Sequence, residues 1–230
     1  MAKFTPGPTV AAVSGSVGGT VYSRNRYGAY MRFRAIPVTS TTSFALAAKS
    51  RFGSTAALFQ ALTAAQKAAW EAWAATNPIT DRLGNQQQLS GAAAYIALNC
   101  RLGAIGSALI DVPPITPAPG GLLSLSQTCD IGAGDFELTF TETPLGATEK
   151  LYIQAALRNS SGVKYIQNLL RFCGVSAAAQ ASTYDHQALV TARIGAPVVG
   201  QTLGVYVSVV DTATGLLSGP LRADTVVTTT

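Results

Sequence analysis

The chain has 230 residues, of which 48% are hydrophobic and only 12% are charged, with a formal net charge of +5. The hydrophobic content excludes an intrinsically disordered chain, and no stretch approaches the roughly 18 continuous apolar residues of a membrane-spanning helix, so we expect no membrane partner. A surface with so few charges is typical of a subunit that neighbours cover in an assembly. This length accommodates two domains, each with its own core.

The charges are distributed unevenly along the chain. Residues 1–70 contain eight basic and no acidic residues, a formal charge of +8, whereas residues 71–230 contain eight basic and eleven acidic residues, a formal charge of −3. A segment this basic requires an anionic or acceptor-rich partner, or extensive solvent. The basic residues before residue 71 are Lys3, Arg24, Arg26, Arg32, Arg34, Lys49, Arg51 and Lys67.

Residues 1–19 are rich in Gly, Pro, Ser and Thr, which predicts an extended N-terminal arm that becomes ordered against a neighbour. Pro and Gly at positions 6–8 interrupt the apolar run that a secretion signal needs, so we expect synthesis in a reducing cytoplasm. The three cysteines are odd in number and far apart, which indicates neither a disulfide framework nor a zinc site. We expect all three to be buried small side chains: Cys100, Cys129 and Cys173.

A β-hairpin is predicted next. Residues 20–24 and 29–36 favour strands, and the intervening Asn-Arg-Tyr-Gly segment supplies a turn. Because side chains alternate along a strand, the second strand should present one apolar face and one cationic face. The apolar face would carry Ala29, Met31, Phe33 and Ala35, and the cationic face Tyr30, Arg32 and Arg34.

More than one kind of partner fits this hairpin. Arginines bind carboxylates and backbone carbonyls of proteins, and tyrosines anchor protein interfaces, so we favour protein docking. The same side chains can also contact phosphates and stack on bases, which is the nucleic-acid interpretation, and a merely solvated face is the third. The candidate protein-docking residues are Arg24, Arg26, Tyr27, Tyr30, Arg32 and Arg34.

The first predicted helix covers residues 43–62. Its apolar residues recur at spacings of three and four, which places them on one stripe of the helix surface. We expect this stripe to lie in the core. It consists of Phe44, Ala48, Phe52, Thr55, Phe59 and Leu62.

Two more helices follow. One starts at a capping box that begins with Thr63, and the other covers residues 91–106 with Ser90 as its N-cap. The two tryptophans of the earlier helix, Trp70 and Trp73, are expected to fill a gap between elements. The alternative is that they are exposed aromatic anchors for a partner.

Residues 111–121, with the sequence DVPPITPAPGG, form the clearest boundary, because Pro and Gly cannot continue a helix or a central strand. We therefore predict an extended arm at 1–19 and a hairpin-and-helix anchoring domain at 20–112. A stiff linker at 113–121 would then lead into a β-sandwich domain at 122–230.

The pattern of the last part of the chain predicts short strands separated by turn residues. About seven such strands over about 110 residues predict an immunoglobulin-like or fibronectin-III-like sandwich of two sheets. The expected fold class is therefore an α+β N-terminal unit followed by an all-β sandwich. The predicted strands cover residues 122–128, 136–141, 150–158, 163–173, 186–193, 202–211 and 221–229.

Candidate catalytic residues are few. His186 is the single histidine, and because it follows Asp185 at the start of a predicted strand, the two side chains should project to opposite faces. We interpret it as a surface or strand-edge histidine. Asp135 and Glu137 share one strand face and are interpreted as solvated carboxylates. We expect no catalytic residues, no metal site and no cofactor, so the chain is not predicted to be an enzyme.

One part of the chain resembles a known family. The stretches GSVGGTVYSRNRYGAYMRFRAIPV, LTAAQKAAWEAWA and NPITDRLGNQQQLSGAAAYIALN, followed by a Pro-Pro pair, are similar to an uncharacterised family of small structural proteins encoded by tailed bacteriophages. The similarity covers residues 14–114, about half of the chain. The resemblance implies a virion structural protein, and an appended immunoglobulin-like domain is a common accessory on capsid and tail proteins of such phages.

The resemblance leads to a specific expectation. We expect a capsid decoration or cement protein, located in the virion after synthesis in the host cytoplasm and forming homo-oligomers. Its partner would be the major capsid protein or another virion subunit, contacted through the basic hairpin. The alternatives are a structural component of the neck or tail, and a nucleic-acid-binding protein that uses the same hairpin.

Overall fold

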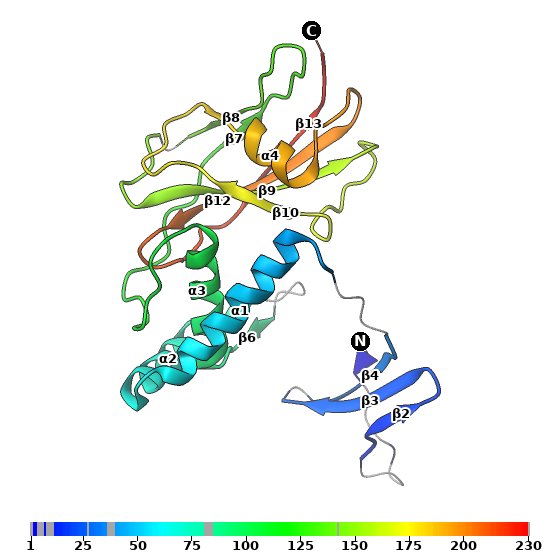
Figure 1. The fold of residues 1–230 in the computed structure, drawn as a ribbon, viewed down its shortest axis with the longest axis vertical. Helices are drawn as coiled ribbons and strands as arrows, with labels where there is room; N and C mark the ends of the chain where they lie inside the picture. Colours follow the sequence, from blue (N-terminus) through cyan, green and yellow to red (C-terminus); the bar gives the residue numbers. More distant parts are fainter. Residues whose placement is uncertain are drawn as a thin grey trace. The chain divides into compact units, whose positions relative to one another are not determined.

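The computed structural model describes residues 2–3, 7, 12–26, 28–35, 40–80, 85–141 and 143–229. Contacts divide the chain into two compact units, Met1–Ala47 and Ala48–Thr230. The described residues form a mixed α+β fold with four helices and several antiparallel sheets, none of which is closed (Figure 1).

The first unit contains four strands, β1 (Ala2–Lys3), β2 (Gly15–Val17), β3 (Thr20–Asn25) and β4 (Gly28–Phe33). They form one antiparallel sheet in the order β1-β4-β3-β2. The predicted hairpin is present as β3 and β4, which end in the pair Asn25 and Gly28. Gly28 has φ 111°, in the left-handed region that favours glycine. Two short pieces of the expected arm, β1 and β2, pair with this hairpin of their own chain.

Three helices lie where the sequence predicts them: α1 (Ser43–Ala61), α2 (Ala64–Thr76) and α3 (Gly91–Ala104). The capping box of α2 is confirmed, since the Gln66 N–H donates to Thr63 Oγ1 at 3.3 Å and the Thr63 N–H donates to Gln66 Oε1 at 2.9 Å. The cap of α3 is also confirmed, with Ser90 Oγ accepting from the Ala93 N–H at 3.3 Å. A short strand pair, β5 (Ile79–Thr80) and β6 (Gln86–Gln87), separates α2 from α3.

Aromatic packing holds the three helices together. Trp70 is fully buried, its ring meets the Tyr95 ring edge-on at a centroid distance of 5.3 Å, and its Nε1–H donates to the Asp111 carbonyl at 2.9 Å. Trp73 is half-buried against the same cluster. Helices α2 and α3 touch at Gly91, where a Cβ would lie 2.6 Å from the Glu71 backbone nitrogen. Trp70 therefore fills a gap between helices, as expected, and is not exposed for binding.

The predicted core stripe of α1 is only partly buried. Thr55 and Phe59 are buried against the other helices, but Phe44 and Phe52 are exposed, Phe52 to 58%. The expectation that the whole stripe lies in the core is therefore wrong for its first half. The spacing of three and four identifies a face of the helix, but it does not show how far along that face the neighbouring elements extend.

Besides the β5–β6 pair, the described part of the second unit contains two antiparallel sheets. The larger has the order β10-β9-β12-β13 and the smaller the order β11-β8-β7. Strands β9 and β12 pair over their full length, from Thr202 opposite Arg158 to Asp211 opposite Glu149. The strands are β7 (Leu125–Gln127), β8 (Glu137–Phe140), β9 (Glu149–Arg158), β10 (Arg171–Val175), β11 (Tyr184–Asp185), β12 (Thr202–Asp211) and β13 (Leu221–Val226).

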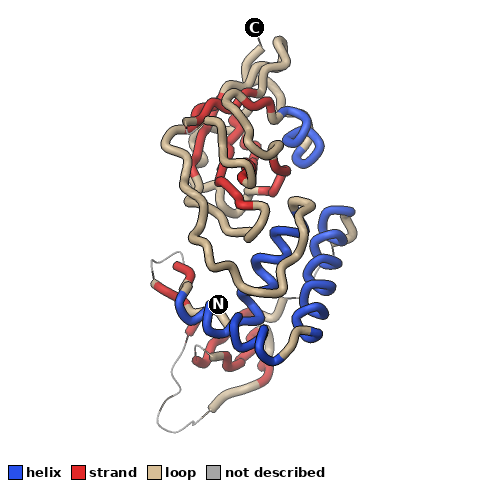
Figure 2. Tube along the Cα trace, turned by 90° about the vertical axis from the view of Figure 1, so that its left-hand side faces the viewer, coloured by secondary structure: helices blue, strands red, loops and turns tan. Residues whose placement is uncertain are grey.

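One predicted strand is a helix instead. Residues 187–194 form α4 (Gln187–Ile194), which ends at Gly195 with φ 90° (Figure 2). In this helix Val190 and Ile194 lie four residues apart and both pack on the sheet core. Tertiary packing therefore uses them as one face of a helix. The strand predicted at 163–173 is also shorter at its start than expected: β10 begins only at Arg171.

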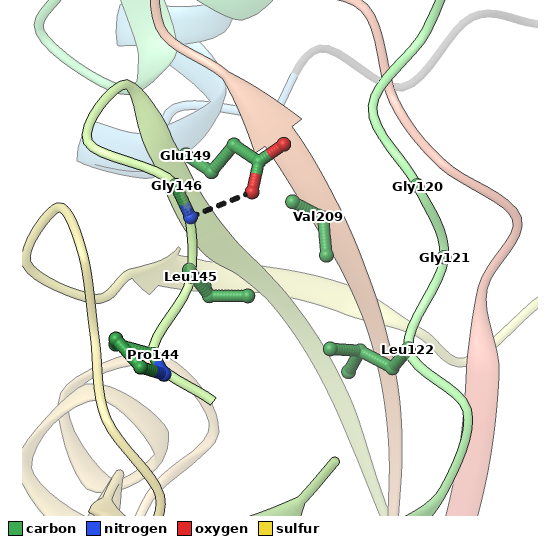
Figure 3. Close-up of a pocket in the computed structure, with 8 residues that line it drawn as sticks. All are labelled: Gly120, Gly121, Leu122, Pro144, Leu145, Gly146, Glu149 and Val209. Carbon is green, nitrogen blue, oxygen red and sulfur yellow. Dashed lines mark hydrogen bonds between the residues drawn. The ribbon is translucent and has the colours of Figure 1, made fainter. Parts of the chain in front are cut away.

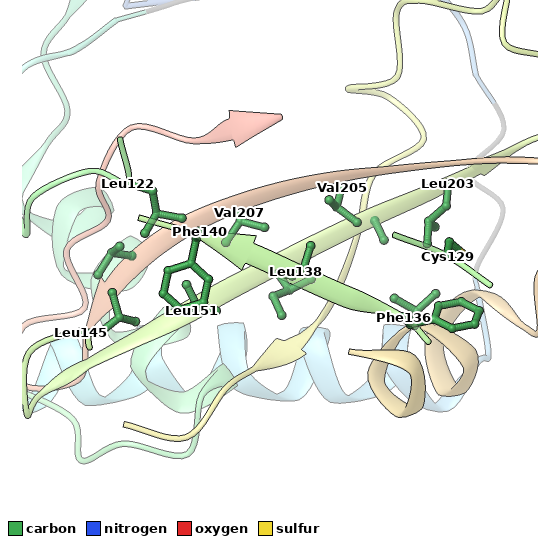
Figure 4. Packing of buried hydrophobic residues seen from close by; sticks show 14 of the residues in the cluster. Leu122, Cys129, Phe136, Leu138, Phe140, Leu145, Leu151, Leu203, Val205 and Val207 are labelled. Carbon is green, nitrogen blue, oxygen red and sulfur yellow. The ribbon is translucent and has the colours of Figure 1, made fainter. Parts of the chain in front are cut away.

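A shared hydrophobic core lies between the two sheets (Figure 4). Phe136, Leu138 and Phe140 point into it from β8 and its approach, which confirms the alternation predicted for this strand. The β9 and β12 contributions alternate in the same way, and Cys129 is buried among them. The β9 and β12 members are Leu151, Ile153, Ala155, Leu203, Val205, Val207 and Val209.

The outer face of the larger sheet is covered as well. At one end, Leu102 of α3 and Ile105, the C-cap of this helix, form a small core with Val210 of β12. Helices and sheets therefore belong to one compact unit, so the predicted grouping of the helices with the hairpin is not confirmed. The expected linker, residues 113–121, lies inside this second unit.

An ion pair between a buried arginine and a partly exposed aspartate lies at the other end of this outer face. Arg158, only 5% exposed, contacts Asp224 Oδ1 through its Nη2 at 2.7 Å, and the more exposed Arg222 contacts Asp224 Oδ2 at 2.6 Å. Gly204 makes room for this pair, because a Cβ there would lie 2.6 Å from Asp224 Oδ1 and 2.7 Å from Ile166 Cδ1. The segment between β9 and β10 contains the buried Ile166 and contacts both arginines, since the Val163 carbonyl accepts from Arg158 and the Lys164 carbonyl from Arg222.

Candidate functional site

The net charge of the protein lies entirely in the first unit. Residues 1–47 contain five basic and no acidic residues, whereas residues 48–230 contain eleven of each. The formal charges are therefore +5 and zero. The basic N-terminal sheet, strands β1 to β4, is the candidate docking surface.

The β3–β4 register divides the hairpin side chains between two faces. Residues directly opposite each other in an antiparallel pair share a face. Tyr22 lies opposite Met31 and Arg24 opposite Ala29, so Arg24 shares the face of Met31 and Phe33. Arg32 lies opposite Val21 on the other face, together with Tyr30. The alternation expected along β4 is present, but the arginines of the hairpin are divided between the two faces.

The apolar side of this sheet is exposed. Phe33 is 86% exposed, and Val17 and Met31 are exposed as well. None of the described side chains of residues 1–47 is buried. A small sheet without a buried face gains stability when a partner covers it. The sheet therefore has exposed apolar side chains on one face and an arginine on each of its two faces.

The structure places the predicted docking residues as follows. Arg24 lies in β3, Arg26 in the turn, Tyr30 and Arg32 in β4, and Arg34 directly after β4. The Arg34 N–H donates to the Gly19 carbonyl at 2.7 Å, which extends the hairpin by one bond. Tyr27 lies outside the described residues. The other two candidate residues, Trp70 and Trp73, belong to the helical core of the second unit.

His186 does not match its prediction. It is fully buried at the start of α4, where burial lowers its pKa to about 4, and the weaker effects of the Phe136 carbonyl and Asp185 oppose this shift. Its Nε2 lies 3.5 Å from Gln127 Nε2, and the Asp185 carboxylate accepts instead from the Gln187 N–H at 2.8 Å. The expectation of a surface or strand-edge histidine is wrong because residues 187–194 form a helix that covers it. A buried neutral imidazole without an orienting carboxylate is a packing residue.

Two hollows elsewhere in the second unit carry little chemistry. Asp130, Asp135 and Glu137 line a hollow of about 430 Å³, but Asp130 Oδ1 already accepts from the N–H groups of Gly132 and Ala133. No cluster of three or more possible metal ligands occurs among the residues that the structure describes.

A smaller pocket of about 100 Å³ lies between the loop at Pro144 and the segment at Gly121 (Figure 3). Its one carboxylate, Glu149, accepts from the Gly146 N–H at 2.8 Å. Leu122, Leu145 and Val209 line the rest of its wall. The pocket is too small for an organic cofactor.

Comparison with known proteins found no matching family model and no matching curated protein. Within the described ranges, no helix has the length and apolar character needed to cross a bilayer. The resemblance of residues 14–114 to tailed-phage proteins stays a prediction.

Proposed function

We propose that this protein is a structural subunit of a tailed-bacteriophage virion, a capsid decoration or cement protein that docks through its basic N-terminal sheet. The observation that carries the proposal is the concentration of the whole net charge in a sheet whose apolar residues are exposed. The low charge content of the chain and the resemblance of its N-terminal half support the same role.

The docking chemistry follows from the faces of the sheet. Phe33 and Met31 are apolar anchors, and Arg24 beside them pairs with a carboxylate or a carbonyl of the partner. A matching surface on the major capsid protein is an apolar hollow edged with acidic side chains. Residues 122–230, in which two sheets share one core, are the immunoglobulin-like part of this proposal and project from the shell or contact neighbours.

The division of the arginines favours protein docking over nucleic-acid binding. A ribbon that follows a phosphate backbone gains most when its cations share one face. Here Arg24 and Arg32 lie on opposite faces, and the Arg24 face also carries exposed Phe33. This face suits a mixed apolar and acidic protein surface.

The copy number of the protein in purified particles tests the proposal. Quantitative mass spectrometry should find copies on the scale of the capsid lattice. Six or twelve copies would instead indicate the neck or tail, and absence from the particle would refute a virion role. Binding of the full chain to DNA that weakens steeply with salt would support the nucleic-acid alternative.

A variant tests the docking surface itself. Phe33→Ser should abolish co-sedimentation of added protein with particles that lack it. Val198→Ser, at an exposed apolar position of the second unit, is the matched control and should bind normally. Equal binding by both variants would show that the sheet is not the docking surface.

A further inference from the structure

A groove of about 370 Å³ lies between α1, α3 and the outer face of the larger sheet, within the second unit. Its floor is the stacked pair of Tyr152 from β9 and Phe172 from β10, with ring centroids 4.4 Å apart. Phe52 of α1 forms one wall, and the small residues Ala97 and Ala104 of α3 form the other. The groove is therefore lined by three aromatic rings.

The groove continues the exposed first half of the α1 stripe. Thr55 and Phe59 of this stripe are buried against the other helices, whereas Phe52, one turn earlier, lines the groove and is 58% exposed. An apolar stripe on a helix normally faces a packing partner along its length. Beside Phe52, an open groove takes the place of that partner.

Two guanidinium groups make the groove cationic. Arg51 and Arg101 line it and no acidic side chain does. Arg101 Nη1 donates to the Gly215 carbonyl, whereas the Arg51 guanidinium makes no hydrogen bond or ion pair within the described part of the chain. Burial raises the pKa of Tyr152, and the charges of Arg101 and Arg51 act in the opposite direction, so both charges lie near the groove floor. An occupant should carry a carboxylate.

The chain itself contains a segment of matching chemistry. Residues 111–119 read DVPPITPAP, and Pro114 to Pro117 form a P-x-x-P spacing. Ile115 between these prolines is fully exposed, Val112 is exposed, and the carboxylate-bearing Asp111 precedes them. Pro-rich segments bind aromatic-lined grooves because their extended conformation is already ordered.

We propose that the aromatic groove of one molecule binds the Pro-rich segment 111–119 of a second copy. The rings of Phe52, Tyr152 and Phe172 receive the prolines and Ile115, and Arg51 pairs with Asp111 of the neighbour. Because each molecule offers both a groove and a segment on different surfaces, the contact is head-to-tail. The segment is short, so the contact is weak in dilute solution and becomes effective when copies are held close together. This inference does not depend on the virion role.

Sedimentation velocity of the full chain from about 10 µM to 1 mM tests the contact. Self-association should rise with concentration, and both Phe52→Ser and Ile115→Asp should weaken it at least tenfold. Both side chains are exposed, so these variants should fold, which circular dichroism verifies. Val198→Ser is the matched apolar control, and Phe33→Ser reports any association through the N-terminal sheet.

A charge exchange provides the sharper test. Arg51→Asp and Asp111→Arg should each weaken self-association, because groove and segment then carry like charges. A mixture of the two variants should associate again, since in both contacts between unlike variants the groove meets a segment of opposite charge. A synthetic peptide of residues 109–121 should also bind the full chain in fluorescence anisotropy and lose that binding with Phe52→Ser. A chain that stays monomeric to 1 mM and does not bind the peptide would overturn the proposal. So would association that neither groove nor segment variants change.

Discussion

Acidification should destabilise the second unit through one residue, His186. The imidazole is fully buried beside the Phe136 ring, at a centroid distance of 6.2 Å, and its pKa falls from 6.5 to about 4 because burial disfavours the charged form. In the unfolded chain the imidazole binds a proton below about pH 6.5. In the folded chain it does so only below about pH 4. Protons therefore favour the unfolded state, and stability falls as the pH drops from 6.5 to 4.

The size of the effect follows from the two pKa values. Linkage gives a loss of about 2 kcal/mol between pH 7.5 and pH 5, rising to about 3 kcal/mol near pH 4. His186 is the single histidine of the sequence, so no other imidazole titrates in this range. Ordinary carboxylates titrate at lower pH and contribute little above pH 5. The pH 7.5 to 5 window is therefore almost specific for this side chain.

Urea unfolding followed by circular dichroism at several pH values measures this loss. His186→Gln replaces the imidazole with a neutral amide and should remove the pH dependence between 7.5 and 5. Val207→Ala, a core variant distant in sequence from the imidazole, should lower stability by a constant amount and keep the wild-type slope. If wild type lost less than about 0.5 kcal/mol by pH 5, or if His186→Gln kept the wild-type slope, the buried neutral imidazole would be refuted.

Two further pairs of substitutions test a close helix contact and an ion pair by the same unfolding measurement. Gly91→Ala should destabilise the protein by about 2 kcal/mol, despite the better helix propensity of alanine, because the new Cβ meets the α2 backbone at 2.6 Å. A Cβ at Gly103 in the same helix would make only ordinary contacts, with Arg51 Cδ at 3.5 Å and Leu109 Cδ2 at 3.9 Å, so Gly103→Ala should be neutral or stabilising by up to about 1 kcal/mol. Equal effects of the two substitutions would contradict the close contact at Gly91. Asp224→Asn leaves the buried Arg158 without its counter-charge and should cost about 3 kcal/mol, whereas loss of the exposed partner in Arg222→Ala should cost less than about 1 kcal/mol. The opposite ranking would show that the Arg158 pair contributes little.

Features set by local interactions were predictable from the sequence. The starts of α2 and α3 follow from side chains that cap the backbone within three residues, as Thr63 and Ser90 do. The positions of β9 and β12 follow from long alternating or β-branched runs. In each case the signal and the structure that it determines lie in the same short segment.

Features set by distant contacts were not predictable. Val190 and Ile194 are compatible with either a strand or a helix, and it is their packing on the sheet core that stabilises the helix. The exposure of Phe52 depends on where α3 and the sheet end, which the α1 sequence does not encode. At the candidate docking surface, the sequence located the arginines and tyrosines, but the β3–β4 register decides that Arg24 shares a face with Phe33. The position of the unit boundary at Ala47 also depends on tertiary contacts alone.

The full-length pairing of β9 with β12 has a consequence for amide hydrogen exchange. Both strands lie inside the larger sheet, and β12 is buried along nearly its whole length, so their amides should exchange only when the second unit unfolds globally. The amides of β3 and β4 belong to a unit in which none of the described side chains is buried, and they should exchange much faster. One exchange experiment on the intact chain thus reports the two units separately. Protection gained only in β3 and β4 on adding a partner would locate the bound surface without any mutation.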